Sequence, residues 1–488
     1  MKQGNIEQDT VKQEIMEQET IKQGTMEQET MKQKTMKQGT MKQINGRQAE
    51  GKQANLLEEP VNRLFFKYLA PSISATLVTS IYILADTVMI GRGVGAIGVA
   101  ALNIILPMFS LFFGTGILLG VGGGVLFSVS KGKGDERGAR QYFTVAFFCA
   151  VVLSVFYVAG SLLFFEPITR FLGSTAAMKE YVDEYGYYIC IGAPAFLLSS
   201  FLQAFVRNDK APHRAMAAVI AGGVSNVILD YIFIFPWHMG MAGAAIASII
   251  GTLITIVILL THFLSPANTL KLCQGGRPAM AGRVVVSGLS SFLIELANGA
   301  IIFLFNRQLL SYVGDLGVVV YGIISNSALI VNSVCNGIGQ ALQPIAAVNF
   351  GAGNGERVEK TRHLGMAAAL AAGILFMSFG LFFPQVITEV FVKADDEILQ
   401  MAVPAVRVYF ISFSAMGLNI LLGTYFQSVM KPAYALVICL LRGLIFSGLF
   451  VFLLPLVFGV EGIWMTMPVT EAFTLVVGLG LLKRKRDG

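Results

Sequence analysis

Residues 64–90 read LFFKYLAPSISATLVTSIYILADTVMI, a long apolar run that contains a single acid, Asp86. About 20 apolar residues in a helix cross the roughly 30 Å hydrocarbon core of a bilayer. Comparable runs recur along the chain, which is 55% hydrophobic and only 14% charged, whereas a soluble protein carries about 25% charge. The helical hydropathy and the 52 glycines favour a helical bundle over a β-barrel, whose strands alternate. The sequence therefore predicts an all-α integral membrane protein.

We predict twelve transmembrane helices. They are expected near residues 64–90, 98–128, 141–165, 184–206, 213–235, 242–264, 284–310, 318–348, 364–388, 400–428, 433–457 and 462–482. The loops between them separate by charge. One set carries Lys131, Lys133, Arg207, Arg277, Arg357 and Lys431. The other set is richer in acids, and because basic residues mark the cytoplasmic side, we expect both termini in the cytoplasm.

The chain also repeats itself. GKGDERGAR begins at Gly132, and the similar stretch GAGNGERVEK begins at Gly351. The same interval separates GMAG at Gly240 from GVEG at Gly459, and an interval one residue longer separates Pro212 from Pro432. An even number of spans separates the copies, so the two lobes have the same orientation, as in transporters built from parallel repeats.

Five segments follow from this reading. We expect a disordered, low-complexity cytoplasmic tail at 1–55, where pentapeptides such as MEQET and MKQGT recur. An N-terminal six-helix lobe spans 60–264, and a basic cytoplasmic linker spans 265–283. A C-terminal six-helix lobe spans 284–482, and a basic cytoplasmic tail spans 483–488.

Two acids of the N-terminal lobe are expected at one depth. Asp86 and Asp230 each lie about five residues before the outer end of a span, which is some 7–8 Å below the surface. Asn226 precedes Asp230 by one helical turn, and Ser248 lies near the outer start of the sixth span. Carboxylate, amide and hydroxyl oxygens suit a proton or Na⁺, so we predict a cation-coupling site. The alternative is that each group satisfies a neighbouring backbone group.

Glu295 stands alone near the middle of the seventh span. Acids at this depth normally face a protein interior or a watery cavity. It is therefore a candidate for binding a cationic substrate or a second proton. The alternative is an internal salt bridge with Arg307, Arg407 or Arg442, which also lie in apolar runs.

The eighth span carries a polar stripe. Asn332, Asn336, Gln340 and Gln343 are spaced by 4, 4 and 3 residues, which places them on one helix face. We expect this face to line a substrate cavity, with hydrogen bonding between helices as the alternative.

Several function classes are not supported. The glycine-rich run 114–124 lacks the Gly-Lys-Ser/Thr of a phosphate-binding loop and fits close helix packing. No catalytic Ser-His-Asp or Cys-His arrangement stands out, and the five cysteines form no Cys-x-x-Cys pair. We expect no enzyme activity, no cofactor, no nucleic-acid partner, and no metal other than a possible Na⁺ at the coupling site.

The sequence resembles the multidrug and toxic compound extrusion (MATE) family across about residues 60–482. The motifs are LADTVMIGRGVGAIGVAAL from Leu84, FVRNDKAPHRAM from Phe205, SNVILDYIFIF from Ser225, GMAGAAIAS from Gly240, GLSSFLIELANG from Gly288 and ALQPIAAVNFGAGNGERV from Ala341. The resemblance implies two six-helix lobes around a central cavity, with the coupling cation held by Asp86, Asn226 and Asp230. Ser248 stands where a Thr is frequent, and residues 406–426, the tenth span, carry no acid.

The expected function is antiport: export of amphipathic organic cations in exchange for inward H⁺ or Na⁺. The alternative is a flippase or exporter of a lipid-linked or polyanionic substrate from the same superfamily, which the intramembrane arginines would suit. We expect a multi-pass protein of the cell inner membrane that functions as a monomer in the lipid bilayer.

Overall fold

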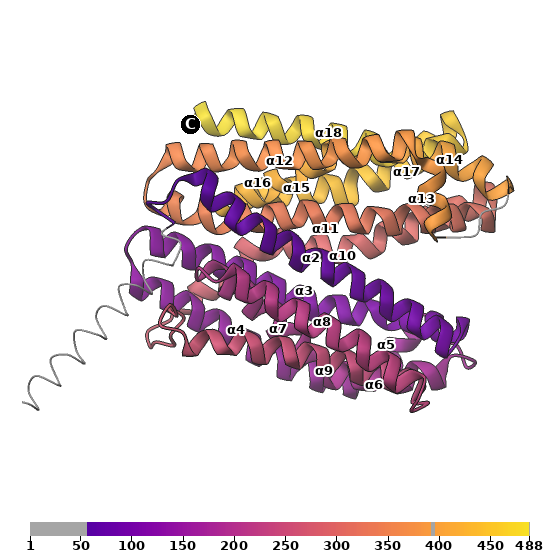
Figure 1. The fold of residues 1–488 in the computed structure, drawn as a ribbon, viewed down its shortest axis with the longest axis horizontal. Helices are drawn as coiled ribbons and strands as arrows, with labels where there is room; N and C mark the ends of the chain where they lie inside the picture. Colours follow the sequence, from indigo (N-terminus) through magenta and orange to yellow (C-terminus); the bar gives the residue numbers. More distant parts are fainter. Residues whose placement is uncertain (1–55, 392–395, 488) are drawn as a thin grey trace, which may run out of the picture. The chain divides into compact units, whose positions relative to one another are not determined.

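The computed structural model describes residues 56–391 and 396–487, and the predicted tail at 1–55 lies outside this range. All regular structure in the described residues is helical. The N-terminal lobe (indigo to magenta in Figure 1) consists of α2 (Val61–Gly93), α3 (Ala96–Gly132), α4 (Glu136–Leu163), α5 (Phe165–Phe171), α6 (Lys179–Ile191), α7 (Ala193–Asn208), α8 (Pro212–Ile234), α9 (Gly240–Leu260) and η1 (Thr261–Leu264). The C-terminal lobe (salmon to yellow) consists of α10 (Pro278–Val313), α11 (Asp315–Gly351), α12 (Gly355–Phe382), α13 (Pro384–Phe391), α14 (Asp396–Phe410), α15 (Phe413–Ser428), α16 (Pro432–Leu440), the π-helix η2 (Leu441–Ile445), α17 (Phe446–Phe458) and α18 (Val460–Asp487).

The prediction of twelve spans is confirmed for the described residues. Ten helices or continuous helix runs are long and apolar enough to cross a membrane, and two bent pairs complete the set. The α6–α7 pair bends by 50° and the α14–α15 pair by 42°. Two expected spans, 141–165 and 364–388, extend past the ends of α4 and α12. The chain breaks at Phe164 and at Phe383 and then forms the short helices α5 and α13. Pro384 has no N–H with which to continue α12.

The repeat is visible in the backbone. Residues with positive φ recur in corresponding places of the two lobes: Gly95 and Gly314, Gly134 and Gly353, Lys210 and Met430, and Gly240 and Gly459. Lys210 and Met430 adopt φ of 63° and 57°, although neither is glycine. Each stands two residues before a helix that begins with proline, so the two lobes make the same tight turn between corresponding helices.

The two lobes meet where α3 packs against α10 and α11 and where α2 packs against α11. A Cβ on Gly132 would lie 2.0 Å from the carbonyl oxygen of Val348, and a Cβ on Gly351 would lie 2.1 Å from that of Val129. These two contacts exchange under the repeat, so α3 and α11 cross with twofold symmetry at their C-terminal ends. We call this crossing the glycine seam. It lies on the basic side of the bundle (left in Figure 1), where the loops 133–135, 209–211, 352–354 and 429–431 connect the helices.

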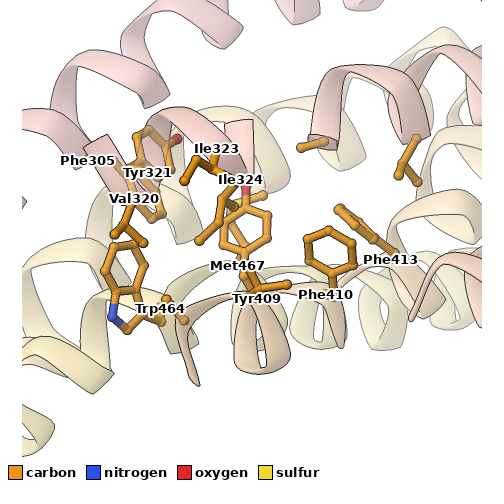
Figure 2. Close-up of a cluster of buried hydrophobic side chains, with 14 of the residues drawn as sticks. Phe305, Val320, Tyr321, Ile323, Ile324, Tyr409, Phe410, Phe413, Trp464 and Met467 are labelled. Carbon is orange, nitrogen blue, oxygen red and sulfur yellow. The ribbon is translucent and has the colours of Figure 1, made fainter. Parts of the chain in front are cut away.

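A buried cluster fills the C-terminal lobe away from the glycine seam. Figure 2 shows its aromatic members from five helices: Phe305 of α10, Tyr321 of α11, Tyr409 and Phe410 of α14, Phe413 of α15, and Trp464 of α18. Phe305 and Tyr321 stack with their ring centroids 4.8 Å apart. This packing holds α10, α11, α14 and α18 together and so fixes the frame in which the polar groups described below are placed.

A side chain at the glycine seam is expected to destabilise this arrangement. Gly132→Ala or Gly351→Ala puts a methyl group against a carbonyl oxygen, and overpacking of this kind costs about 1–3 kcal/mol. The readout is the thermal unfolding midpoint of the purified protein. Gly322→Ala on α11 is the control, because nothing lies within 4 Å of a Cβ there. An equal midpoint for the seam and control variants would contradict the close crossing.

Candidate ion-coupling site

The predicted coupling residues come together on three helices. α8 packs closely against α9, because a Cβ on Gly222 would lie 2.5 Å from the carbonyl oxygen of Gly251. This approach lets the Asn226 side-chain amide of α8 donate a hydrogen bond to the Ser248 hydroxyl of α9 at 3.3 Å. Asn226 and Asp230 are buried, at 3% and 0% exposure. The structure therefore brings the amide and hydroxyl groups into direct contact.

Asp86 reaches the same place from α2, which packs along α8. The carboxyls of Asp86 and Asp230 lie close enough to interact electrostatically. Four buried oxygens have no hydrogen-bond partner in the described part of the chain: Oδ1 of Asp86, Oδ1 of Asn226, and both carboxyl oxygens of Asp230. A buried acceptor without a partner is costly, so this cluster is suited to taking up a proton or a small cation.

Two tyrosines beside the acids were missed in the sequence. Tyr82 of α2 lies near Asp86, and Tyr185 of α6 lies near both Asp86 and Asp230. Tyr82 precedes Asp86 by one helical turn, a spacing that could have been noticed. Tyr185 carries no comparable signal, because only the packing of α6 brings it near.

The helix that carries Asp86 is also bonded to the other lobe. The Thr76 hydroxyl donates to the Ser333 carbonyl of α11 at 2.7 Å, and the hydroxyls of Ser80 and Ser333 are hydrogen-bonded to each other. One helical turn after Ser333 on α11, a Cβ on Gly337 would lie 2.6 Å from Cα of Ile73. α2 therefore contacts the acid site of its own lobe on one side and α11 of the C-terminal lobe on another.

Glu295 lies on α10 where this helix crosses α3. Its Cβ is 3.4 Å from the position of a Cβ on Gly114. None of the hydrogen bonds and ion pairs found within residues 56–391 and 396–487 involves Glu295. Arg442, one of its three suggested salt-bridge partners, pairs with another acid. Glu295 is thus far from the Asp86 group in sequence, and none of the hydrogen bonds and ion pairs of the described residues connects the two.

The polar stripe of α11 divides into different environments. Asn336 is exposed, whereas Gln343 is 2% exposed and its amide nitrogen has no partner in the described structure. Gln340 accepts a hydrogen bond from Arg207 of α7 at 2.8 Å, a contact between the lobes. Asn332 accepts one from Arg442 at 3.3 Å. Two of the four residues therefore bond to neighbouring helices, as in the alternative interpretation.

A buried ion pair of the C-terminal lobe was also missed. Arg442 of the π-helix donates from Nε to Glu471 of α18 at 2.6 Å, and the Asn419 amide of α15 donates to the other carboxyl oxygen at 2.7 Å. Glu471 and Asn419 are fully buried. The signal in the sequence was an acid within an apolar helix, but the Thr and Pro residues before Glu471 interrupt that apolar run.

Comparisons with known proteins agree on one family. A family model described as MatE matches residues 71–232 and 292–452, once in each lobe. The chain is 23% identical over 450 residues to the multidrug export protein MepA of Staphylococcus aureus, which covers 88% of this chain and 95% of MepA.

Solved structures share the fold. An outward-facing multidrug resistance MATE family transporter of the MOP superfamily superposes with a TM-score of 0.84 at 20% identity, covering 89% of this chain and 98% of the other. A MOP superfamily transporter from Pyrococcus furiosus, whose binding pocket is described as having reverse polarity, superposes with a TM-score of 0.82 at 21% identity and the same coverage.

The buried ion pair predicts a non-additive mutational effect. Glu471→Gln leaves the Arg442 charge buried without its partner, and a loss of about 3–5 kcal/mol is expected. Combining it with Arg442→Gln removes the orphaned charge, so the double variant is expected to be more stable than the sum of the single losses. Thermal unfolding of all three variants measures this, with Glu461→Gln, an exposed acid on the same helix, as the control. Additive losses would contradict a direct interaction.

Proposed function

Because the chain belongs to the MatE family, we propose that it is a secondary antiporter that exports amphipathic organic cations in exchange for inward H⁺ or Na⁺. The observation that carries the proposal is the group of buried, unpartnered oxygens on Asp86, Asn226 and Asp230. Acids at bilayer depth are expensive to insert, by roughly 2.5–3.5 kcal/mol each on insertion scales. A cation that binds there relieves this cost, and its gradient can then drive the transport cycle.

The residues fit either coupling ion. A proton on Asp86 or Asp230 removes one of two neighbouring negative charges, which favours binding of the first proton. A Na⁺ ion would be held by the two carboxyl groups and the Asn226 carbonyl oxygen, because hard cations prefer oxygen ligands. In both cases Ser248 accepts a hydrogen bond from the Asn226 amide nitrogen, and the amide oxygen has no partner in the described structure and so can bind the ion.

The signal passes to the C-terminal lobe through α2. Ion binding changes the charge on Asp86 and therefore the attraction between α2 and α8. Any shift of α2 strains its hydrogen bonds from Thr76 and Ser80 to Ser333. Ser333 is the residue after Asn332, which belongs to the polar stripe of α11. α2 therefore links the ion site to the helix that we assign to substrate contact. The ion thus shifts the balance between two arrangements of the lobes.

Organic cations are the proposed cargo. Glu295 is an acid without an ion-pair partner in the described chain, and Asn336 is an exposed amide; both suit a positively charged, amphipathic ligand. Of the three arginines in apolar runs that would suit a polyanionic cargo, Arg442 has its charge matched by Glu471. The relative MepA is named for multidrug export, which agrees with this assignment. We place the protein in the cell inner membrane as a monomer with both termini in the cytoplasm.

Replacing either coupling acid is expected to abolish ion-driven export. Asp86→Asn and Asp230→Asn remove the charge that the cation neutralises while keeping a similar shape. The measurement is ethidium efflux from vesicles with H⁺ and Na⁺ gradients imposed separately, which also identifies the coupling ion. Glu180→Gln, an exposed acid on α6, is the control. If both Asn variants keep full export and full cation dependence, this mechanism is wrong.

The hydroxyl of Ser248 is expected to tune ion affinity. Ser248→Ala removes the partner of the Asn226 amide, and a hydrogen bond of about 0.5–1.5 kcal/mol corresponds to a roughly two- to tenfold rise in the half-maximal ion concentration. Ser248→Thr keeps the hydroxyl and should preserve the wild-type value. The same efflux assay at graded ion concentrations separates these outcomes. If the Ala variant keeps the wild-type half-maximal ion concentration, Ser248 does not contribute to the site.

A further inference from the structure

A second polar feature lies on the basic side, beside the glycine seam. A pocket of about 510 Å³ opens there between α3 and α4 of the N-terminal lobe and α10 and α16 of the C-terminal lobe. Val129, whose carbonyl oxygen contacts Gly351, forms part of its wall. The pocket therefore exists only while the two lobes are joined at this end.

The pocket is positively charged. Lys133 and Arg283 line it from opposite lobes, and its lining includes no Asp or Glu. Both side chains are exposed, and neither takes part in an ion pair within the described residues. Arg283 donates a hydrogen bond to the Tyr142 hydroxyl at 3.4 Å, which leaves the tyrosine proton available to another acceptor. Two cations and a hydroxyl donor thus face one space.

Two further hydroxyls in the lining have no protein partner. Ser130 and Ser287 are 8% and 3% exposed, and no hydrogen bond of their hydroxyls occurs within the described chain. Each hydroxyl is therefore available to bond to a ligand in the pocket. Together with Lys133 and Arg283, these donors match the several acceptor oxygens of a phosphate group.

We propose that this pocket binds the phosphate headgroup of an anionic phospholipid from the membrane leaflet on the basic side. Clusters of Lys and Arg between transmembrane helices on the cytoplasmic side suit such headgroups. The apolar part of the lining supports a lipid over a free phosphate: Leu126 and Val129 form the inner wall, and Val286, 57% exposed, continues it onto the outer face of α10. The acyl chains can follow this surface while the headgroup stays with the basic residues.

Lipid binding would also affect the balance between conformations. The walls come from both lobes, so the lipid contacts all of them only when the glycine seam is closed. A ligand that binds one arrangement more tightly shifts the protein towards it. The anionic lipid is thus expected to stabilise the structure described here, independently of the coupling ion and the cargo.

The test uses the full chain in nanodiscs. Wild-type protein in phosphatidylglycerol is expected to unfold at a higher temperature than in phosphatidylcholine. About 1 kcal/mol per basic residue corresponds to a roughly fivefold change in affinity for each. The Lys133→Gln/Arg283→Gln variant should therefore bind anionic lipid roughly 25-fold more weakly, as measured by titrating the lipid into detergent-purified protein. It should also lose the lipid-dependent rise in unfolding temperature.

Three comparisons make the outcome decisive. Arg63→Gln/Lys271→Gln removes the same charge from exposed basic-side positions outside the pocket and should keep the wild-type response. Lys133→Arg/Arg283→Lys keeps the charge and should keep most of the binding, even if the Gln variant proves unstable. Inorganic phosphate replaces the lipid in a third arm. Equal responses of the pocket and control variants would overturn the site, and a full response to inorganic phosphate would overturn the lipid as its ligand.

Discussion

A charge buried in a membrane protein must be neutralised by a partner or by an ion, and the buried acids of this chain differ in whether the described structure gives them a partner. In the C-terminal lobe, Glu471 is held by Arg442 and Asn419. In the N-terminal lobe, Asp86 and Asp230 lie close together, and no ion pair among residues 56–391 and 396–487 involves either of them. A paired acid is structural because its charge is permanently balanced. An unpaired acid is left to be balanced from outside, as we propose for Asp86 and Asp230.

The features that could be predicted from the sequence depend on local length and spacing. Twelve apolar runs and landmarks repeated at a nearly constant interval gave the spans and the parallel repeat, because neither requires knowledge of which helices touch. Asn226 and Asp230 share a helix face for the same local reason. Glu471 and Arg442 meet across helices, 29 residues apart, and Tyr185 approaches the acids only through helix packing. Such contacts follow from tertiary structure, which the spacing of residues does not reveal.

The lobes touch in different ways at the basic end of the bundle and near the middle of α2 and α11. At the glycine seam the backbones meet directly, with no side chain to adjust. Farther along α2 and α11 the contact is made by hydroxyls, at Thr76, Ser80 and Ser333. Hydroxyl contacts can exchange partners at small cost, whereas a backbone crossing either fits or separates. The lobes are thus joined by backbone crossings that cannot adjust and by hydroxyl contacts that can.

The bends between α6 and α7 and between α14 and α15 differ in length by one residue. In the N-terminal lobe a single residue, Gly192, separates α6 from α7, whereas Ile411 and Ser412 separate α14 from α15. The interval between the two copies therefore lengthens by one residue at the bend. One residue added inside a helix would rotate everything after it by about 100°. Placed at a bend, it leaves the apolar faces on both sides in phase, so the bend accommodates a difference of one residue between the two copies without repacking the core.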